Sequence, residues 1–245
     1  MNAAPQVEKT VGEWVVERPS RARVFERLGI DYCCGGKHPL RQACVKKSLD
    51  YEVVLAELER DGAAPEEGAR NWASASLTDL CDHIEQTHHA YLKQELPRLE
   101  FLTTKVAARH GDTRPALRQV HQVFVTLKSE MEGHMMKEER VLFPYILRLA
   151  EIAESGDAIG GSPFGTVENP IRMMEYEHET VGSALKTLRR LTSDHTAPAD
   201  GCNTFRGLYH GFAELERELM EHIHLENNVL HPRAVEMEKG MLATA

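Results

Sequence analysis

One pattern of eleven residues occurs twice in this chain, and it limits the fold more than any other feature. HMMKEERVLFP, which begins at His134, is matched 88 positions later by HIHLENNVLHP, which begins at His222. A second pair of segments, around His89 and His178, repeats at an offset of 89. Internal similarity of this kind indicates one helical hairpin used twice.

The stretches around these repeats have the period of amphipathic helix. Apolar residues recur three and four positions apart, and glycine-containing breaks near Gly111, Gly156 and Gly201 separate the periodic segments. The expected helices cover roughly 76–110, 114–150, 168–195 and 202–238. Runs of alternating β-branched residues are few, so no sheet is expected. The predicted fold class is all-α, with an up-down-up-down four-helix bundle.

The first 60 residues form a separate short helical unit in this interpretation. Helix is expected from Thr10 to Leu28 and from Leu49 to Arg60, with a glycine-rich turn at Gly29–Gly36 between them. The following segment is small, polar and contains proline and glycine, as linkers do. We therefore predict a cysteine-bearing helical domain at 1–60, a linker at 61–75 and the bundle at 76–240.

Each copy of the repeated pattern places a histidine and a glutamate four residues apart on the apolar face of its helix. His134 and Glu138 lie on that face in the first copy, and His222 and Glu226 in the second. A carboxylate that points into a core is costly unless a positive charge pairs with it. No Lys or Arg shares the apolar stripe at these levels, so a bound metal cation is expected.

The four histidines are predicted to meet at one height of the bundle. In an antiparallel hairpin, two residues lie side by side when the turn is midway between them. The midpoints between successive members of the series His89, His134, His178 and His222 all fall on glycine-containing breaks. The glutamates lie one helical turn further, ~6 Å along the axis.

The types of side chain narrow the choice of metal. The expected metal ligands are His89, His134, Glu138, His178, His222 and Glu226. Four imidazoles and two carboxylates are too many for one tetrahedral zinc ion and suit two ions bridged by the glutamates. Nitrogen and oxygen ligands favour iron or manganese, while zinc and copper stay open as alternatives.

The ligand from the first bundle helix is ambiguous. Simple helical periodicity with Ile84 and Tyr91 places His88 nearer the apolar stripe than His89. The internal repeat instead favours His89, because the offset of 89 aligns it with His178 together with four apolar pairs. We predict His89.

A second motif carries paired thiols. Cys33 and Cys34 are followed by two glycines, which permit a tight turn that presents both side chains. Adjacent cysteines do not easily form a disulfide with each other. Lys37 and Arg41 are expected to lower the thiol pKa values. The pair is interpreted as a redox dithiol, a docking point for a client protein or a transient metal ligand, and the alternative is a packed turn with inert thiols.

The remaining cysteines and the overall composition exclude several classes. Five cysteines in 245 residues do not form a disulfide framework, and Cys81 and Cys202 are expected to be ordinary buried residues. A net charge of −9 without a basic stripe argues against nucleic acid as a partner. No stretch approaches the ~20 apolar residues of a membrane span, and the N-terminus lacks the apolar segment of a secretory signal. A cytoplasmic protein is expected, and the sequence leaves its oligomeric state open, a homodimer included.

Together, these motifs resemble a known family. They are DYCCGGK from Asp31, DHI from Asp82 with His89 and QELP from Gln94, HMMKE from His134, EHE from Glu177, and LENN from Leu225 after His222. The chain resembles, over nearly its whole length, the repair-of-iron-centres family, the YtfE/ScdA/DnrN/NorA group of di-iron proteins.

The resemblance implies a ScdA-like domain with the CCGG turn, followed by a hemerythrin-like domain. It implies a non-haem di-iron centre at the six residues named above, with both glutamates and an oxo group bridging. It also implies a role in restoring iron–sulfur clusters damaged by nitric oxide or oxidants in the bacterial cytoplasm, with damaged iron–sulfur proteins as partners.

Three functions are compatible with these expectations. The first is a repair protein that donates iron from a labile centre, with Cys33 and Cys34 assisting. The second is an enzyme that reduces nitric oxide to nitrous oxide. The third is a module that binds or senses nitric oxide or oxygen, which the paired thiols disfavour because a simple carrier does not need them.

Overall fold

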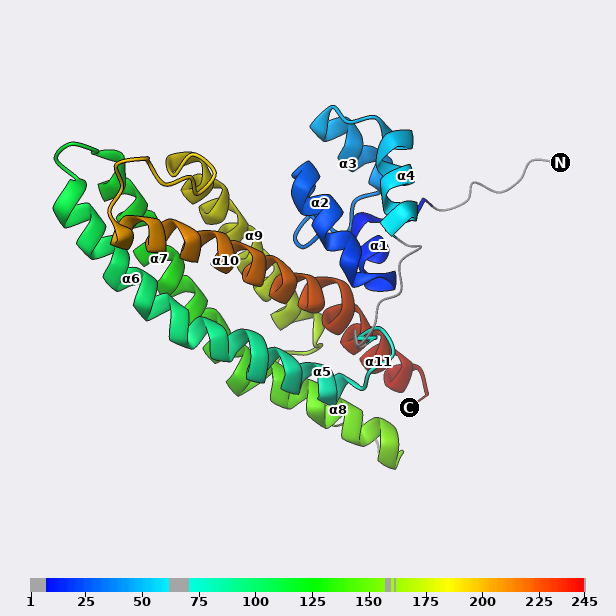
Figure 1. Cartoon of the computed structure of the whole chain (residues 1–245). Helices are drawn as coiled ribbons and strands as arrows, with labels where there is room; N and C mark the ends of the chain where they lie inside the picture. The colour runs from blue at the N-terminus through cyan, green and yellow to red at the C-terminus, as the bar shows by residue number, and fades with distance from the viewer. Residues whose placement is uncertain (1–7, 62–70, 157–159, 161, 245) are drawn as a thin grey trace.

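The computed structural model describes residues 8–61, 71–156, 160 and 162–244, and its main body is a bundle of four long helical rods (Figure 1). In chain order the rods are α5 (Leu77–His83) with η2 (Ile84–His89) and α6 (Ala90–His110); α7 (Ala116–Lys137) with η3 (Glu138–Leu142) and α8 (Phe143–Ser155); α9 (Glu168–Leu191); and α10 (Asn203–Leu225) with η4 (Glu226–Leu230) and α11 (His231–Thr244). The elements η2, η3 and η4 are short π-helical turns within otherwise α-helical rods.

The predicted fold class is confirmed. The first rod packs on the second and the fourth, and the second packs on the third. In the described part of the chain, the only β-type pairing is one isolated bridge between Thr10 and Pro39. The first rod begins at Leu77 and the third at Glu168, as the hydrophobic period predicts. None of the helices within the described ranges combines the length and apolar character that a membrane span requires.

The apolar stripes of the rods form the core. One cluster fills the half of the bundle on the side of the connection between α6 and α7, where Phe124 and Phe212 face each other at a ring distance of 5.5 Å. A second cluster fills the other end, around Ile84, Phe143 and Leu230. Polar ligand-type side chains occupy the space between these clusters, so the site is surrounded by apolar packing on both sides.

The N-terminal unit differs from the expectation in its helices. Its elements are α1 (Val11–Glu17), η1 (Pro19–Arg21), α2 (Ala22–Leu28), α3 (Leu40–Lys47) and α4 (Tyr51–Asp61). A single helix from Thr10 to Leu28 is wrong, because Arg18 is extended and the following Pro19 disfavours helical geometry in the residue before it. Helix α3 was not expected. Most of the predicted linker at 61–75 lies outside the described residues, and the domain division stays a prediction.

The glycine-rich turn of this unit is inserted into the bundle. Cys33 belongs to the same buried cluster as the leucines of the rods. The Asn228 side chain donates hydrogen bonds to the carbonyl groups of Tyr32, at 3.2 Å, and Cys33, at 3.3 Å. A side chain at Gly36 would collide with Asn228 and with the Tyr32 carbonyl, so only glycine fits this close approach. Figure 1 shows the N-terminal unit beside α9 and α10.

Candidate metal centre

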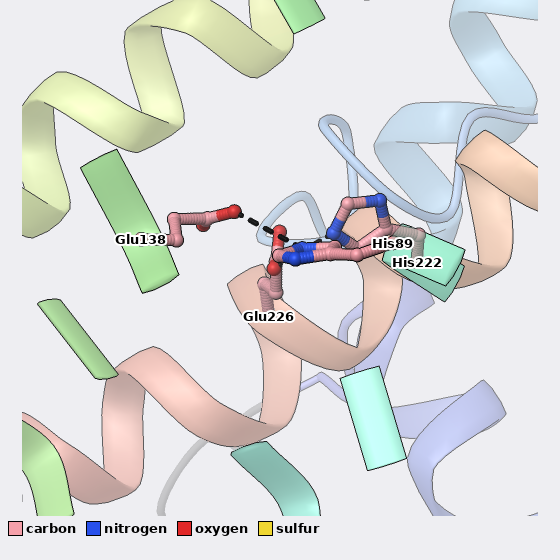
Figure 2. A group of neighbouring side chains, drawn as sticks. All are labelled: His89, Glu138, His222 and Glu226. Atoms are coloured by element: carbon pink, nitrogen blue, oxygen red, sulfur yellow. Dashed lines mark hydrogen bonds and ion pairs between the residues drawn. The ribbon is translucent and has the colours of Figure 1, made fainter. Parts of the chain in front are cut away.

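The six predicted ligand residues come from all four rods and meet inside the bundle, as Figure 2 shows for four of them. His89 ends η2, His134 lies in α7, Glu138 begins η3, His178 lies in α9, His222 lies in α10 and Glu226 begins η4. All six are buried, with at most 1% of each residue exposed. Because their helices belong to one packed core, the side chains are held in place before any ligand arrives.

These residues form two overlapping groups. One consists of His89, His222 and both glutamates, and the other of His134, His178 and both glutamates; in each group one potential ligand atom per residue lies within 4.8 Å of all the others. Each group therefore offers two imidazoles and shares both carboxylates with its neighbour. This is the arrangement in which two metal ions are bridged by two glutamates.

Glu138 lies between two of the histidines. Its Oε2 atom is 3.4 Å from Nε2 of His89 and 3.2 Å from Nε2 of His134. Among the described residues, both oxygens of Glu138 and Nε2 of His89 nevertheless have no hydrogen-bond partner. These atoms therefore approach one another without the alignment of a hydrogen bond, as ligands that point to a common position between them do.

Glu226 occupies the matching place in the second half of the repeat. Its Oε2 atom is 3.1 Å from Nε2 of His178, and its Oε1 atom is 2.8 Å from Nε2 of His222. The Nε2 atoms of His178 and His134 lie 3.0 Å apart, which brings the two halves together. Four imidazole nitrogens and two carboxylates thus face one small volume.

The electrostatics of this volume require positive charge. Burial would lower the pKa of His134, but the carboxylates of Glu138, Glu177 and Glu226 raise it to about 10. Burial would likewise raise the pKa of Glu138, and the neighbouring His134 and His89 hold it below its usual value. Two buried carboxylates thus need protons or cations beside them. A pair of divalent or trivalent metal ions fits this donor set.

Three of the four imidazoles are oriented through their second ring nitrogen. Nδ1 of His89 lies 2.8 Å from Glu139, Nδ1 of His134 lies 3.0 Å from Glu177, and Nδ1 of His178 lies 2.8 Å from Asn227. Partners of this kind fix the ring so that Nε2 faces the metal and increase the basicity of the imidazole. Nδ1 of His222 has no hydrogen-bond partner in the described residues.

Each of these outer partners is next in sequence to one of the six residues of the site. Glu177 adjoins His178 in the chain, yet it contacts His134. Glu139 and Asn227 were missed, although the repeat contains the signal. Each residue directly follows one of the two glutamates of the site, and the offset of 88 places one on the other.

The π-helical turn η2 explains the ambiguity between His88 and His89. A π-helical turn contains an extra residue, so it shifts the phase of all side chains that follow it. Both residues are buried, but only His89 reaches the two glutamates. His88 instead lies beside this group, with Nδ1 2.6 Å from Glu218. The turns η3 and η4 begin at Glu138 and Glu226.

The paired thiols lie next to the backbone of His178, one of the predicted ligands. The Sγ atoms of Cys33 and Cys34 are 3.9 Å apart, and the Cys34 thiol donates a hydrogen bond to the carbonyl oxygen of His178 at 3.4 Å. Asp31 joins the two cysteines in a third group of potential metal ligands. The turn therefore contacts the backbone of the site as well as presenting its own ligand atoms.

The expectation that nearby cations lower the thiol pKa values is wrong for Cys33. Lys37 is held by Glu175 at 2.7 Å, and Arg41 lies over the ring of Tyr51. The neighbouring Cys34 thiol, burial and Asp31 together raise the pKa of Cys33 well above its usual value. Cys33 is therefore a protonated thiol at neutral pH in this structure.

The other cysteines follow the prediction in part. Cys81 is buried, as expected, whereas Cys202 is exposed just before α10, so its predicted burial is wrong. The apolar spacing of α10 does not extend to Cys202, which precedes its first turn.

Comparison with known proteins agrees with the site. The family described as "Hemerythrin HHE cation binding domain" matches residues 82–234, and "Domain of Unknown function (DUF542)", ScdA_N, matches residues 7–61. The iron–sulfur cluster repair protein YtfE of Musicola paradisiaca is 38% identical over 232 residues, which are 94% of this chain and 98% of that protein.

The chain belongs to the YtfE family of hemerythrin-like proteins. Two further relatives with the same name support this assignment. The protein of Escherichia coli O157:H7 is 37% identical and that of Enterobacter sp. (strain 638) is 36% identical, each over 228 residues that cover 93% of this chain and 97% of the relative. With the buried cluster, the match confirms the expected cofactor, a pair of non-haem iron ions.

Proposed function

We propose that this chain is a di-iron protein that repairs iron–sulfur clusters damaged by nitrosative or oxidative stress, by donating iron from a labile centre. The observation that carries the proposal is the buried group of four histidines and two glutamates, in a chain whose relatives are named for this repair. His89, His134, His178 and His222 would each bind through Nε2, and Glu138 and Glu226 would bridge.

When bound, the iron supplies the redox chemistry and is also the cargo that is transferred. The protein orients four imidazoles, keeps two carboxylates charged in an apolar interior and excludes water. An oxo bridge would complete the ligand set. The proposed small ligand is nitric oxide or oxygen, and the proposed partner is a damaged iron–sulfur protein. The proposed location is the bacterial cytoplasm. The protein would act there as a single chain or as a homodimer.

The paired thiols are proposed to receive iron or to hold the client cluster. A cavity of about 60 Å³ is lined by Cys33, Cys34, Lys37, Glu175, Glu179 and Asn227. Asn227 also holds Nδ1 of His178, so this cavity lies between the thiols and the ligand set. These contacts support a short exit route for iron from the centre to the turn of the N-terminal domain, for which we propose the range 1–60, with the linker at 61–75 and the bundle at 76–240.

The test follows iron and gas together. Reduced, iron-loaded protein is mixed with nitric oxide in the presence of a ferrous chelator, and a nitrosylated iron–sulfur enzyme is supplied as client. Iron donation predicts chelatable iron and reactivation of the client, without nitrous oxide beyond one equivalent per centre. Sustained nitrous oxide formation with added reductant and no loss of iron would establish the enzymatic alternative instead.

Two variants define the roles of the residues. Glu138→Gln combined with Glu226→Gln should abolish binding of two iron ions, and retention of both would contradict the bridging roles. Cys33→Ser combined with Cys34→Ser should keep both iron ions but slow the reactivation of the client. Unchanged reactivation in this second variant would exclude the thiols from transfer.

A further inference from the structure

Four aromatic side chains form a continuous ladder from the surface to one of the proposed ligands. Trp72 stacks on His83 with ring centres 4.1 Å apart and planes at 22°. His83 meets His88 edge-on at 5.3 Å, and His88 stacks on His222 at 5.6 Å with planes at 9°. None of the first three residues is needed to hold the metal, so their alignment calls for another explanation.

The ladder crosses the bundle wall. Trp72 and His83 are partly exposed, whereas His88 is 2% exposed and His222 is fully buried. Arg233 donates hydrogen bonds to the carbonyl groups of Trp72 and Ala75, which fixes the segment before α5 against the fourth rod. One end of the ladder is therefore accessible to a partner, and the other is in the proposed metal centre.

His88 is positioned for this alignment. Its Nδ1 lies 2.6 Å from a carboxylate oxygen of Glu218, a contact that fixes the plane of the ring. Its Nε2 has no hydrogen-bond partner in the part of the chain that the structure describes, although the residue is almost completely buried. The ring thus faces His222 with its π surface instead of using both nitrogens for hydrogen bonds.

We propose that Trp72, His83 and His88 form the route by which electrons enter the iron centre. The inference rests on the proposed di-iron function. Electron tunnelling weakens steeply with every gap between bonded groups, and stacked π systems in contact provide coupling across such gaps. Each complete transfer moves one electron from a reduced donor through the ladder to a ferric ion. The ferric ion becomes ferrous, and the donor is oxidised. Two donor molecules therefore reduce the pair, and no bond forms or breaks along the ladder.

The surface around Trp72 indicates the kind of donor. Asp79, Asp82 and Glu85 are exposed on α5 and η2, beside His83. The guanidinium group of Arg233, which contacts this segment, is directed to the backbone carbonyl groups of Trp72 and Ala75. An acidic face attracts a partner of opposite charge and accelerates its association. The donor is therefore a one-electron redox protein with a positively charged contact face.

The test measures reduction of the ferric protein directly. The reduced methyl viologen cation radical serves as a one-electron donor, and bleaching of the ferric absorption is followed by stopped flow. Trp72→Leu removes the outer ring, Trp72→Phe keeps an aromatic ring at the same position, and Trp14→Leu changes the only other tryptophan of the chain, which lies in the N-terminal unit.

The ladder predicts that Trp72→Leu slows reduction several-fold and that Trp72→Phe restores most of the rate. Trp14→Leu should behave as wild type. Iron content, the ferric spectrum and the midpoint potential should be the same in all four proteins, which a merely structural role of Trp72 would not require. Added salt should slow wild type through screening of the acidic face.

Equal reduction rates in iron-loaded wild type and Trp72→Leu would overturn the ladder but leave the di-iron proposal intact. Absence of bound iron in wild type would instead overturn the proposed function. A change of midpoint potential in Trp72→Leu that accounts for the slower rate would also exclude the route, because the residue would then act on the metal and not on the path.

Discussion

At the scale of single residues, the properties of the centre depend on side chains that do not touch the metal. Glu139 lies 2.8 Å from Nδ1 of His89 and 2.6 Å from the ammonium group of Lys93. It therefore joins a buried imidazole to a surface cation. Loss of its charge would weaken the hold on the His89 ring and make Nε2 a poorer donor.

We expect Glu139→Gln to weaken iron binding about 10–100-fold, as is typical for such outer partners. The measurement is equilibrium competition with a ferrous chelator. Glu130→Gln is the matched control, because this exposed glutamate lies on the same rod. Equal affinities in the two variants would show that Glu139 does not support the site.

Through Cys81, the free energy of unfolding is expected to depend on pH. Burial raises the pKa of its thiol from 9.0 to about 12. Between these values the unfolded chain loses this proton and the folded chain keeps it, so stability falls as the pH rises from about 9 towards 12. Cys81→Val should reduce this loss, measured as the change in unfolding free energy between about pH 8 and pH 10.

The same burial protects Cys81 from reagents. Iodoacetamide at about pH 9 should modify the exposed Cys202 and leave Cys81 intact, because the thiolate is the reactive form. Peptide mass spectrometry identifies the modified residues. Modification of Cys81 in the folded protein at the rate found for Cys202 would contradict its burial.

At the scale of helices and turns, the sequence predicts much of the molecule. The hydrophobic period locates the four rods, and the repeat alone predicts that the four histidines lie at one level of the bundle. Two features escape this reasoning. Pattern matching assumes a constant 3.6 residues per turn, whereas η2, η3 and η4 each depart from it. The apolar spacing also does not reveal the break at Arg18, which comes from Pro19.

The last two residues of η2, His88 and His89, can be compared by the iron content of their variants. We expect His89→Ala to reduce the iron content below two ions per chain, because one imidazole of the first group is lost. His88→Phe should keep two ions, since its ring lies outside both groups. Metal analysis after anaerobic purification measures both. Loss of iron in His88→Phe with retention in His89→Ala would reverse the assignment.

At the scale of the whole molecule, the CCGG turn joins the N-terminal unit to the bundle, beside α1, which packs on η4. Sequence patterns could not reveal this contact. Asn228 and Tyr32 are far apart in the chain, and no helical period or internal repeat relates one position to the other. Lys186 adds an ion pair with Asp31 at 3.1 Å, which is partly exposed and contributes less than the buried packing.

Gly36→Ala should disturb this contact. Its Cβ atom would lie 2.7 Å from the carbonyl oxygen of Tyr32 and would also collide with the Asn228 side chain, so we expect a loss of about 1–3 kcal/mol from overpacking. Chemical denaturation measures the loss. Gly133→Ala is the control, because a Cβ atom there would meet no described group within 4 Å beyond its own helix backbone and chain neighbours, and a helix interior gains from alanine. Equal stability of Gly36→Ala and wild type would contradict the close fit.

The hydrogen bond from the Cys34 thiol to the backbone carbonyl of His178 links the N-terminal unit to the proposed metal centre. Movement of the turn away from the bundle would break this hydrogen bond to the residue that carries one of the imidazoles. If iron binding stabilises this position of His178, then by reciprocity it also stabilises the docked turn, and loss of iron weakens the docking. The position of the CCGG turn on the surface would then depend on whether the centre holds iron. A client protein that contacts the turn would distinguish loaded from empty protein.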